Sequence, residues 1–239
     1  MPEFRAVLFD LDDTLHDDTL AFTTAAQDVA HEVAAEHGID ALALKKAYIA
    51  EAEGFWHRLS GEQVRTRMTH LRETLWANAL GAVGLSDPAL AQTSASNYYS
   101  YRQKRYELFP GALDLLRGLK ARGIKIGLVT NGFSETHRDK LAVLQIAEYF
   151  DALFLPDETG LVKPDPMLFA QACRRLGVAP AHSVMVGDRY DRDITGAAQA
   201  GLYTIWVNVR ADALPPGAAV PDVTVERIGQ VAAHLLGSS

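Results

Sequence analysis

Residues 5–15 read RAVLFDLDDTL, a short apolar run that ends abruptly in acidic residues. The run itself, Arg5–Phe9, consists of strand formers, and Asp10 follows it directly. A strand that is apolar on both faces is typical of a parallel sheet covered by helices on both sides. In open sheets of this kind ligands bind outside the carboxyl ends of the strands, so the acidic residues after Phe9 mark a candidate binding edge.

Later stretches resemble this first strand and alternate with helical patterns. The predicted strands are Ile124–Val129, Ala152–Leu155, Ser183–Val186 and Tyr203–Val207, and a strand-like DVTV follows at residues 222–225. Between them lie predicted helices over Ala112–Arg122, over Thr136–Leu144, and from Asp165-Pro166, a good helix start, to near Gly177. The alternation predicts parallel strands joined by right-handed crossovers, hence an α/β, doubly wound, Rossmann-like parallel sheet.

One long stretch, from about Thr19 to Tyr106, contains no convincing strand. It predicts four helices, separated by glycine-containing breaks, at residues 19–37, 41–58, 61–80 and 87–105. Because the stretch follows the first strand as one continuous insertion, we expect an all-helical second domain. The predicted boundaries are residues 1–16 and 108–239 for the α/β core and residues 17–107 for the helical cap.

The composition narrows the class of protein. The 239-residue chain carries a net charge of -7, is 48% hydrophobic and contains one cysteine. The negative charge argues against broad nucleic-acid binding, and a single cysteine excludes an intrachain disulfide. No apolar run approaches the roughly 20 residues that a membrane helix needs, and no signal-peptide core precedes Asp10. We therefore expect a cytoplasmic protein with neither nucleic acid nor membrane as a partner. The sequence leaves the oligomeric state open between a monomer and a homodimer.

Polar groups gather where the predicted strands end. They are Asp10, Asp12 and Thr14 after the first strand, Thr130 and Asn131 after the second, Lys163 in a connection, and Asp188, Asp191 and Asp193 after a later strand. Taken singly, each is more typical of a turn, a helix cap or a solvated surface. Because the carboxyl ends of parallel strands share one edge of a sheet, the ordered set predicts a single cleft.

This set of residue types suits phosphoryl transfer. Clustered carboxylates repel one another, and Mg²⁺, which prefers oxygen ligands, relieves that repulsion. A lysine beside hydroxyl and amide donors suits a phosphate group, and an aspartate can act as a nucleophile that forms an aspartyl-phosphate. Phosphoryl transfer requires mainly positioning and charge neutralisation, and the set supplies both.

Four segments carry a family resemblance. FDLDDTL, VTNG, KPDP and VGDRYDRDI, in this order, resemble the four motifs of the haloacid dehalogenase superfamily. Their spacing is similar to that of its phosphatase branch, with a helical cap inserted after the first motif. The amino-acid sequences of the motifs look most like those of nucleoside 5′-monophosphatases and of sugar-phosphate phosphatases of the N-acylneuraminate-9-phosphatase type. The resemblance implies a small phosphomonoester as substrate and Mg²⁺ as cofactor.

Carried over residue by residue, the resemblance implies a catalytic pair and a metal site. Asp10 would attack phosphorus and bind Mg²⁺. Asp12 would protonate the leaving oxygen, then activate water, and its backbone carbonyl would be a further metal ligand. Asp188 would bind the metal directly, and Asp193 would act on metal-bound water.

The resemblance also implies a phosphate cradle. Thr130 and the backbone around Asn131 would hold phosphoryl oxygens, and Lys163 would offset charge between the nucleophile and the phosphoryl group. Thr14 would support the loop of the first motif. His16 either faces the substrate or is a plain hinge residue, and the cap would select the substrate by closing over it.

Asp12 favours phosphoryl transfer over dehalogenation, because dehalogenases of the superfamily lack an acid two residues after the nucleophile. Three alternatives stay open. A phosphomutase of the same superfamily shares the motifs, although many have glycine where this chain has Asp13. The other two are a phosphate-binding protein without turnover and a phosphoacceptor signalling module. In a phosphoacceptor module the phosphorylated aspartate follows a middle strand of the sequence, whereas Asp10 follows the first strand.

Overall fold

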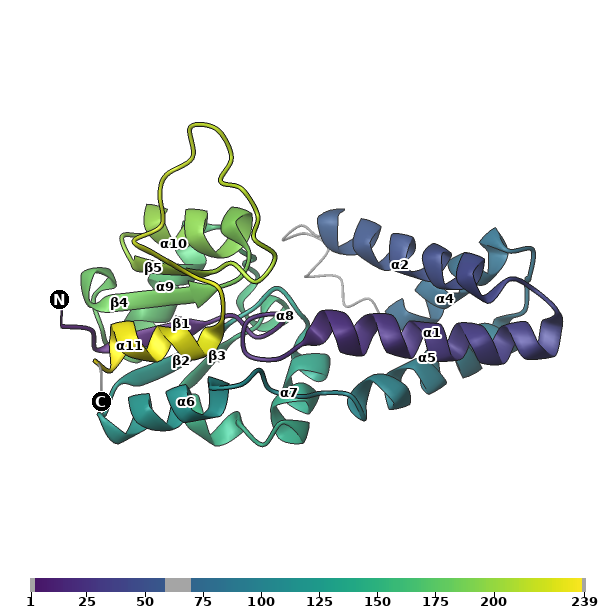
Figure 1. The fold of residues 1–239 in the computed structure, drawn as a ribbon, viewed down its shortest axis with the longest axis horizontal. Coiled ribbons are helices and arrows are strands. Elements are labelled where there is room, and N and C mark those ends of the chain that lie inside the picture. The colour runs from purple at the N-terminus through teal and green to yellow at the C-terminus, as the bar shows by residue number, and fades with distance from the viewer. Residues whose placement is uncertain (1–2, 59–69, 238–239) are drawn as a thin grey trace. The chain divides into compact units, whose positions relative to one another are not determined.

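The computed structural model describes residues 3–58 and 70–237, and within it the chain divides into two compact units (Figure 1). One unit comprises Met1–Asp17 and Glu107–Ser239, and the other comprises Asp18–Tyr106. Since one continuous segment forms the second unit, the first unit is built from two separated stretches of the sequence.

The first unit contains a six-stranded parallel sheet in the order β3-β2-β1-β4-β5-β6. The strands are β1 (Ala6–Phe9), β2 (Lys125–Val129), β3 (Ala152–Phe154), β4 (Ser183–Gly187), β5 (Tyr203–Val207) and β6 (Val223–Val225). The strand that begins the chain therefore lies in the middle of the sheet. This order confirms the predicted α/β, doubly wound architecture, in which the chain runs outward from β1 in both directions.

Alternating side chains of each strand face two apolar layers. Val7 and Phe9 of β1 belong to one core cluster, and Leu8 belongs to the other. Helices α6 (Ala112–Ala121) and α11 (Val231–Leu235) cover the first face, whereas α9 (Pro166–Leu176) and α10 (Thr195–Gln199) cover the second (Figure 1). Burial on both faces explains why these strands are apolar at successive positions.

The strand register brings the motif residues to one edge. Phe9 pairs with Leu128 of β2 and with Val186 of β4, so the three strands end nearly level. Residues that follow these strands therefore emerge side by side, although the end of β1 is more than a hundred positions from the ends of β2 and β4 in the sequence.

Several shorter elements connect or follow these strands. Between strands lie α7 (Ser134–Val143), η1 (Ala147–Tyr149), α8 (Pro156–Thr159), η2 (Pro180–His182) and η3 (Tyr190–Ile194), and η4 (Ile228–Gln230) follows β6. The predicted start and end of the helix after Lys163 are confirmed. Asp165 caps α9 by accepting a hydrogen bond from the Met167 N–H at 2.9 Å, and Gly177 ends it with a φ of 70°.

The second unit is helical. It contains α1 (Asp18–His37), α2 (Ala41–Arg58), α4 (Leu71–Ala82) and α5 (Pro88–Gln103). Residues 61–69 of the predicted helix 61–80 lie outside the described residues, and α4 covers the remainder. The rings of Tyr48 and Trp76 stack with their centroids 4.1 Å apart, and Tyr98 packs 4.9 Å from Tyr48. These buried aromatic side chains hold α2, α4 and α5 together.

Across residues 3–58 and 70–237, no helix has both the length and the hydropathy needed to cross a membrane.

Candidate active site

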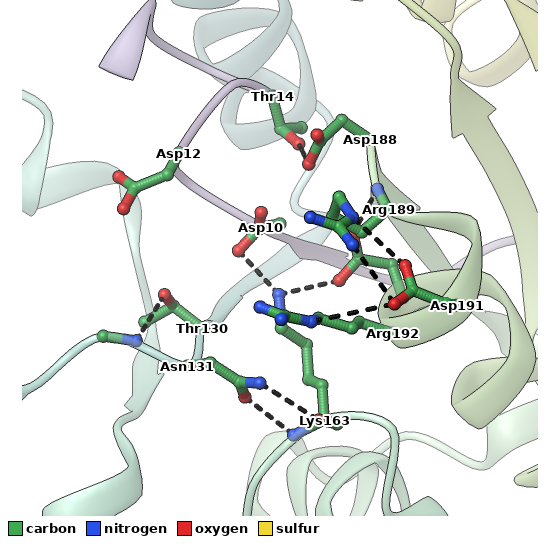
Figure 2. Close-up of polar contacts among 12 residues, drawn as sticks. Asp10, Asp12, Thr14, Thr130, Asn131, Lys163, Asp188, Arg189, Asp191 and Arg192 are labelled. Atoms are coloured by element: carbon green, nitrogen blue, oxygen red, sulfur yellow. Dashed lines mark hydrogen bonds and ion pairs between the residues drawn. The ribbon is translucent and has the colours of Figure 1, made fainter. Parts of the chain in front are cut away.

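Lys163 lies between two buried carboxylates at the carboxyl edge of the sheet. Its Nζ is 2.7 Å from Asp10 Oδ1 and 2.7 Å from Asp193 Oδ1 (Figure 2). Asp10 directly follows β1, and Asp193 lies in η3 after β4. All three side chains are buried, so this ion pair and hydrogen-bond cluster is shielded from water. The fold thus joins residues 153 positions apart in the sequence.

Asp188 lies beside this group at the end of β4. The Thr14 hydroxyl donates to its Oδ1 at 3.3 Å, and the Trp206 indole N–H donates to its backbone carbonyl at 2.8 Å. Arg210 Nη2 lies 2.6 Å from its Oδ2. Thr14 therefore ties the loop after β1 to the end of β4.

The carboxyl groups of this cluster have unusual proton affinities. Burial raises the pKa of Asp10 to about 6, although Lys163 opposes the increase. Burial, together with repulsion from Asp10 and Asp193, raises the pKa of Asp188 to about 8. For Lys163, burial alone would lower the pKa, but Asp10 and Asp193 raise it above its usual value. The site therefore accommodates an excess of negative charge at an energetic cost.

The same carboxylates fit a divalent cation. Asp10, Asp188 and Asp193 each offer an oxygen, and these atoms lie within 4.8 Å of one another. A Cβ added at Gly187 would lie 2.3 Å from Asp193 Oδ2, so the absence of a side chain there makes room for that carboxylate. Oxygen donors that are close, buried and mutually repulsive suit Mg²⁺.

Asp191 does not belong to this group of carboxylates. Its exposed carboxylate pairs with Arg189 and Arg192 (Figure 2).

Thr130 and Asn131 follow β2 at the same edge. The Asn131 side chain forms two hydrogen bonds with the backbone of Lys163: Oδ1 accepts from its N–H at 2.7 Å, and Nδ2 donates to its carbonyl at 3.0 Å. Thr130 Oγ1 accepts from the Gly132 N–H at 3.1 Å and lies 3.0 Å from His137 Nε2. The Asn131 side chain therefore holds the Lys163 segment in place, and Thr130 lies next to Asn131 at the end of β2 (Figure 2).

Asp12 occupies a separate position, with its carboxylate turned away from Asp188 (Figure 2). Lys140 Nζ lies 2.7 Å and His16 Nε2 lies 2.9 Å from Asp12 Oδ1, and His137 Nε2 lies 3.4 Å from Oδ2. Burial alone would raise the pKa of Asp12, but Lys140, His137 and His16 hold it well below the usual value. The imidazole of His16 is fully buried against this carboxylate.

The sequence-based prediction missed His137, Lys140 and Arg210. His137 and Lys140 are three residues apart in α7 and lie on its buried face together with Leu141. The sequence offered one signal for them: His137 and Lys140 are polar residues on the same face of the helix as the apolar Leu141, which marks that face as buried. Arg210 stands in a loop without periodicity, and no local pattern distinguishes it from a solvated arginine.

Known proteins are similar to this chain in sequence and in fold. The haloacid dehalogenase-like hydrolase family model matches residues 4–201. The glyceraldehyde 3-phosphate phosphatase of Methanothermobacter thermautotrophicus is 32% identical over 204 residues, which cover 85% of each chain. The human N-acylneuraminate-9-phosphatase is 32% identical over 241 residues, covering 97% of this chain and 93% of that protein.

A solved structure extends the likeness to the fold. The putative HAD-hydrolase YfnB from Bacillus subtilis, in a magnesium-bound crystal, superposes with a TM-score of 0.77 at 23% identity, over 98% of this chain and 99% of that one. At this identity the match concerns the fold alone. The family model, by contrast, spans most of the sequence and includes all four motif segments. This chain therefore belongs to the haloacid dehalogenase-like hydrolase family.

Proposed function

We propose that this hydrolase is a Mg²⁺-dependent phosphatase that cleaves a small phosphomonoester through an aspartyl-phosphate on Asp10. The observation that carries the proposal is the pairing of Asp10 with the buried Lys163 at 2.7 Å, with a second carboxylate, Asp12, held two residues away by its own cationic partners. We assign the attack on phosphorus to Asp10 and the transfer of protons to Asp12. The curated relatives reported above are both phosphatases, which supports the same reaction class.

In the first step an Asp10 carboxylate oxygen attacks phosphorus. The P–O bond to the leaving group breaks as the Asp10–phosphorus bond forms, and protonated Asp12 gives its proton to the leaving oxygen. The products are an alcohol and the aspartyl-phosphate. The low pKa of Asp12 makes it a carboxylate in the resting site, so in the first turnover it takes its proton from solvent, and in later turnovers it keeps the proton that it accepts from water in the second step.

In the second step water attacks the phosphorus of the aspartyl-phosphate. Asp12, now a carboxylate, accepts a proton from that water, while the Asp10–phosphorus bond breaks and inorganic phosphate leaves. Lys163 and Thr130, with the backbone around Asn131, hold the phosphoryl oxygens through both steps. Charge on these oxygens increases in the transition state, and donors fixed beforehand stabilise it.

Asp10, Asp188 and the backbone carbonyl of Asp12 would hold the Mg²⁺, with Asp193 beside them. When bound, the ion supplies charge neutralisation and alignment of the phosphoryl group. The raised pKa values of Asp10 and Asp188 support this assignment, because a bound cation would favour the charged carboxylates that burial, together with mutual repulsion, disfavours.

The substrate class extends to sugar phosphates and nucleoside monophosphates, and we assign the choice among them to the helical cap, residues 17–107. A cytoplasmic location and a monomeric or homodimeric state remain predictions from the sequence.

Hydrolysis of p-nitrophenyl phosphate and of a panel of sugar phosphates and nucleoside monophosphates tests the proposal. We expect Mg²⁺-dependent release of phosphate that EDTA abolishes and that Asp10→Asn lacks. Asp114→Asn, which changes an exposed carboxylate of α6, is the matched control and should keep wild-type activity. Turnover by Asp10→Asn at the wild-type rate would contradict the assigned nucleophile.

A further inference from the structure

We propose that His137 is a positioning residue that keeps the hydroxyl proton of Thr130 available for a phosphoryl oxygen. The proposal rests on the proposed function, because it takes a phosphoryl group to bind beside Thr130. It extends that function to a residue of α7 that no sequence motif contains.

His137 is built into the site by close packing. Its side chain is buried, and its ring occupies the space in which a side chain at position 132 would lie. A Cβ added at Gly132 would come within 1.6 Å of His137 Cε1 and 2.2 Å of Nδ1. Contacts this short cannot exist, so the position of the His137 imidazole requires a glycine at position 132.

The contacts of the ring indicate which nitrogen carries the proton. Nε2 lies 3.0 Å from Thr130 Oγ1 and 3.4 Å from Asp12 Oδ2. Asp12 is ion-paired with Lys140 at 2.7 Å, so its carboxylate accepts hydrogen bonds from its neighbours. An unprotonated Nε2 would place a lone pair against that carboxylate. The proton therefore belongs on Nε2.

The other ring nitrogen supports the same tautomer. Within the described part of the chain, the buried Nδ1 has no hydrogen-bond partner. A buried N–H without an acceptor is among the costly defects of a folded protein, and a bare lone pair is tolerated more readily. A proton on Nε2 leaves a lone pair, not an N–H, at Nδ1.

This tautomer determines what the Thr130 hydroxyl does. A hydroxyl has two acceptor lone pairs and one donor proton. Thr130 Oγ1 accepts from the Gly132 N–H at 3.1 Å, and in this arrangement it also accepts from His137 Nε2–H. With both lone pairs engaged, the single hydroxyl proton points to a further acceptor. A phosphoryl oxygen beside Thr130 then receives a charge-assisted hydrogen bond.

Nitrogen NMR of the wild-type protein tests the tautomer directly. The protein is labelled with ¹⁵N-histidine, and His137→Gln identifies the resonances of His137, while His182→Gln serves as a control at the opposite end of β4. We expect a protonated, pyrrole-type Nε2 at neutral pH. An unprotonated Nε2 would overturn the proposal, and this readout does not depend on activity.

Inhibition by orthovanadate, measured in the presence of Mg²⁺, tests the consequence. His137→Met removes the donor at similar volume and should weaken vanadate binding about tenfold. His137→Gln, which can place an amide N–H near the position of Nε2, should stay within about threefold of wild type. A general loss of structure would impair both variants alike, and thermal unfolding of each variant reports that separately.

A double-mutant cycle isolates the role of the hydroxyl. In a Thr130→Val background, His137→Met should weaken vanadate binding no further, because the hydroxyl that it orients is gone. Equal losses for His137→Met with and without the hydroxyl would overturn the proposal. If wild-type protein neither binds vanadate nor hydrolyses phosphoesters, the proposed function fails, whereas the NMR result still judges the tautomer.

Discussion

Lys140 and Asp12 are 128 positions apart in the sequence, yet Lys140 Nζ lies 2.7 Å from Asp12 Oδ1. The lysine side chain is almost completely buried in α7, and it faces the loop that follows β1. A buried ammonium group requires a paired charge, so this contact connects α7 to the candidate proton-transfer residue.

Removal of the Lys140 charge should affect both stability and turnover. Lys140→Met leaves the Asp12 carboxylate without its ammonium partner, and we expect a loss of about 2 kcal/mol in the free energy of unfolding. Because Asp12 loses its anchor, kcat/KM for an alkyl phosphate should fall about 100-fold. Urea unfolding and steady-state kinetics measure the two effects.

A matched pair of variants controls this experiment. Lys120→Met also removes a lysine from a lysine–aspartate pair, but that pair, with Asp151, lies at the amino edge of the sheet, so activity should be unchanged. Adding Asp12→Asn to Lys140→Met should restore part of the lost stability. Wild-type stability and activity of Lys140→Met would show that the contact has neither role.

The clamp of Asn131 on Lys163 should be needed for turnover. Asn131→Ala removes both hydrogen bonds to the Lys163 backbone, which should lower kcat at least tenfold because Lys163 Nζ is no longer held beside Asp10. Gln230→Ala is the control. The Gln230 Oε1 atom accepts hydrogen bonds from the backbone N–H groups of Glu226 and Arg227 in an exposed segment after β6, and its removal should leave kcat unchanged. Equal effects of the two substitutions would refute a specific role for Asn131.

Metal binding should be visible without turnover. We expect Mg²⁺ to raise the thermal unfolding midpoint of the wild-type protein, because the ion relieves repulsion among Asp10, Asp188 and Asp193. Asp188→Asn removes one charge of that group and should abolish most of this shift. Differential scanning calorimetry with and without EDTA measures it, and Asp114→Asn should behave as wild type. A Mg²⁺ shift of full size in Asp188→Asn would place the ion elsewhere.

Asp151, which lies far from the candidate active site, should make the free energy of unfolding depend on pH. Burial alone would raise its pKa, but the Ile126 N–H and the Lys125 and Lys120 ammonium groups lower it. A carboxyl group whose pKa is lower in the folded state stabilises the protein above its unfolded pKa, about 4. That stabilisation disappears as the pH falls through the lower folded value.

Comparison of Asp151→Asn with wild type checks this sign. The variant should be about 1 kcal/mol less stable at pH 7, and the difference should shrink steadily below pH 4. Chemical denaturation at several pH values provides the measurement. A difference that grows as the pH falls would mean that the charged form of Asp151 does not stabilise the fold.

Local sequence was sufficient for the architecture and for part of the site. Apolar runs that end in polar residues predicted the strands, and the cap at Asp165 with the stop at Gly177 predicted α9. Because parallel strands end at one edge, the order of the four motifs was enough to expect Asp10, Lys163 and Asp188 together. The structure brings these residues together with Thr14 and Asp193.

The residues that contact these site residues and set their charge environment could be identified only from the tertiary structure, because they lie in elements distant in the sequence. The contacts of His137 and Lys140 with Asp12, of Arg210 with Asp188, and of the Asn131 side chain with the Lys163 backbone join segments whose meeting no periodicity encodes. A hydrophobic pattern reports which face of a helix is buried, but a hydrogen bond depends on the rotation and depth at which that helix packs. Those are set by the whole core, and for this reason the strand ends could be read from the chain while the charge environment of Asp12 could not.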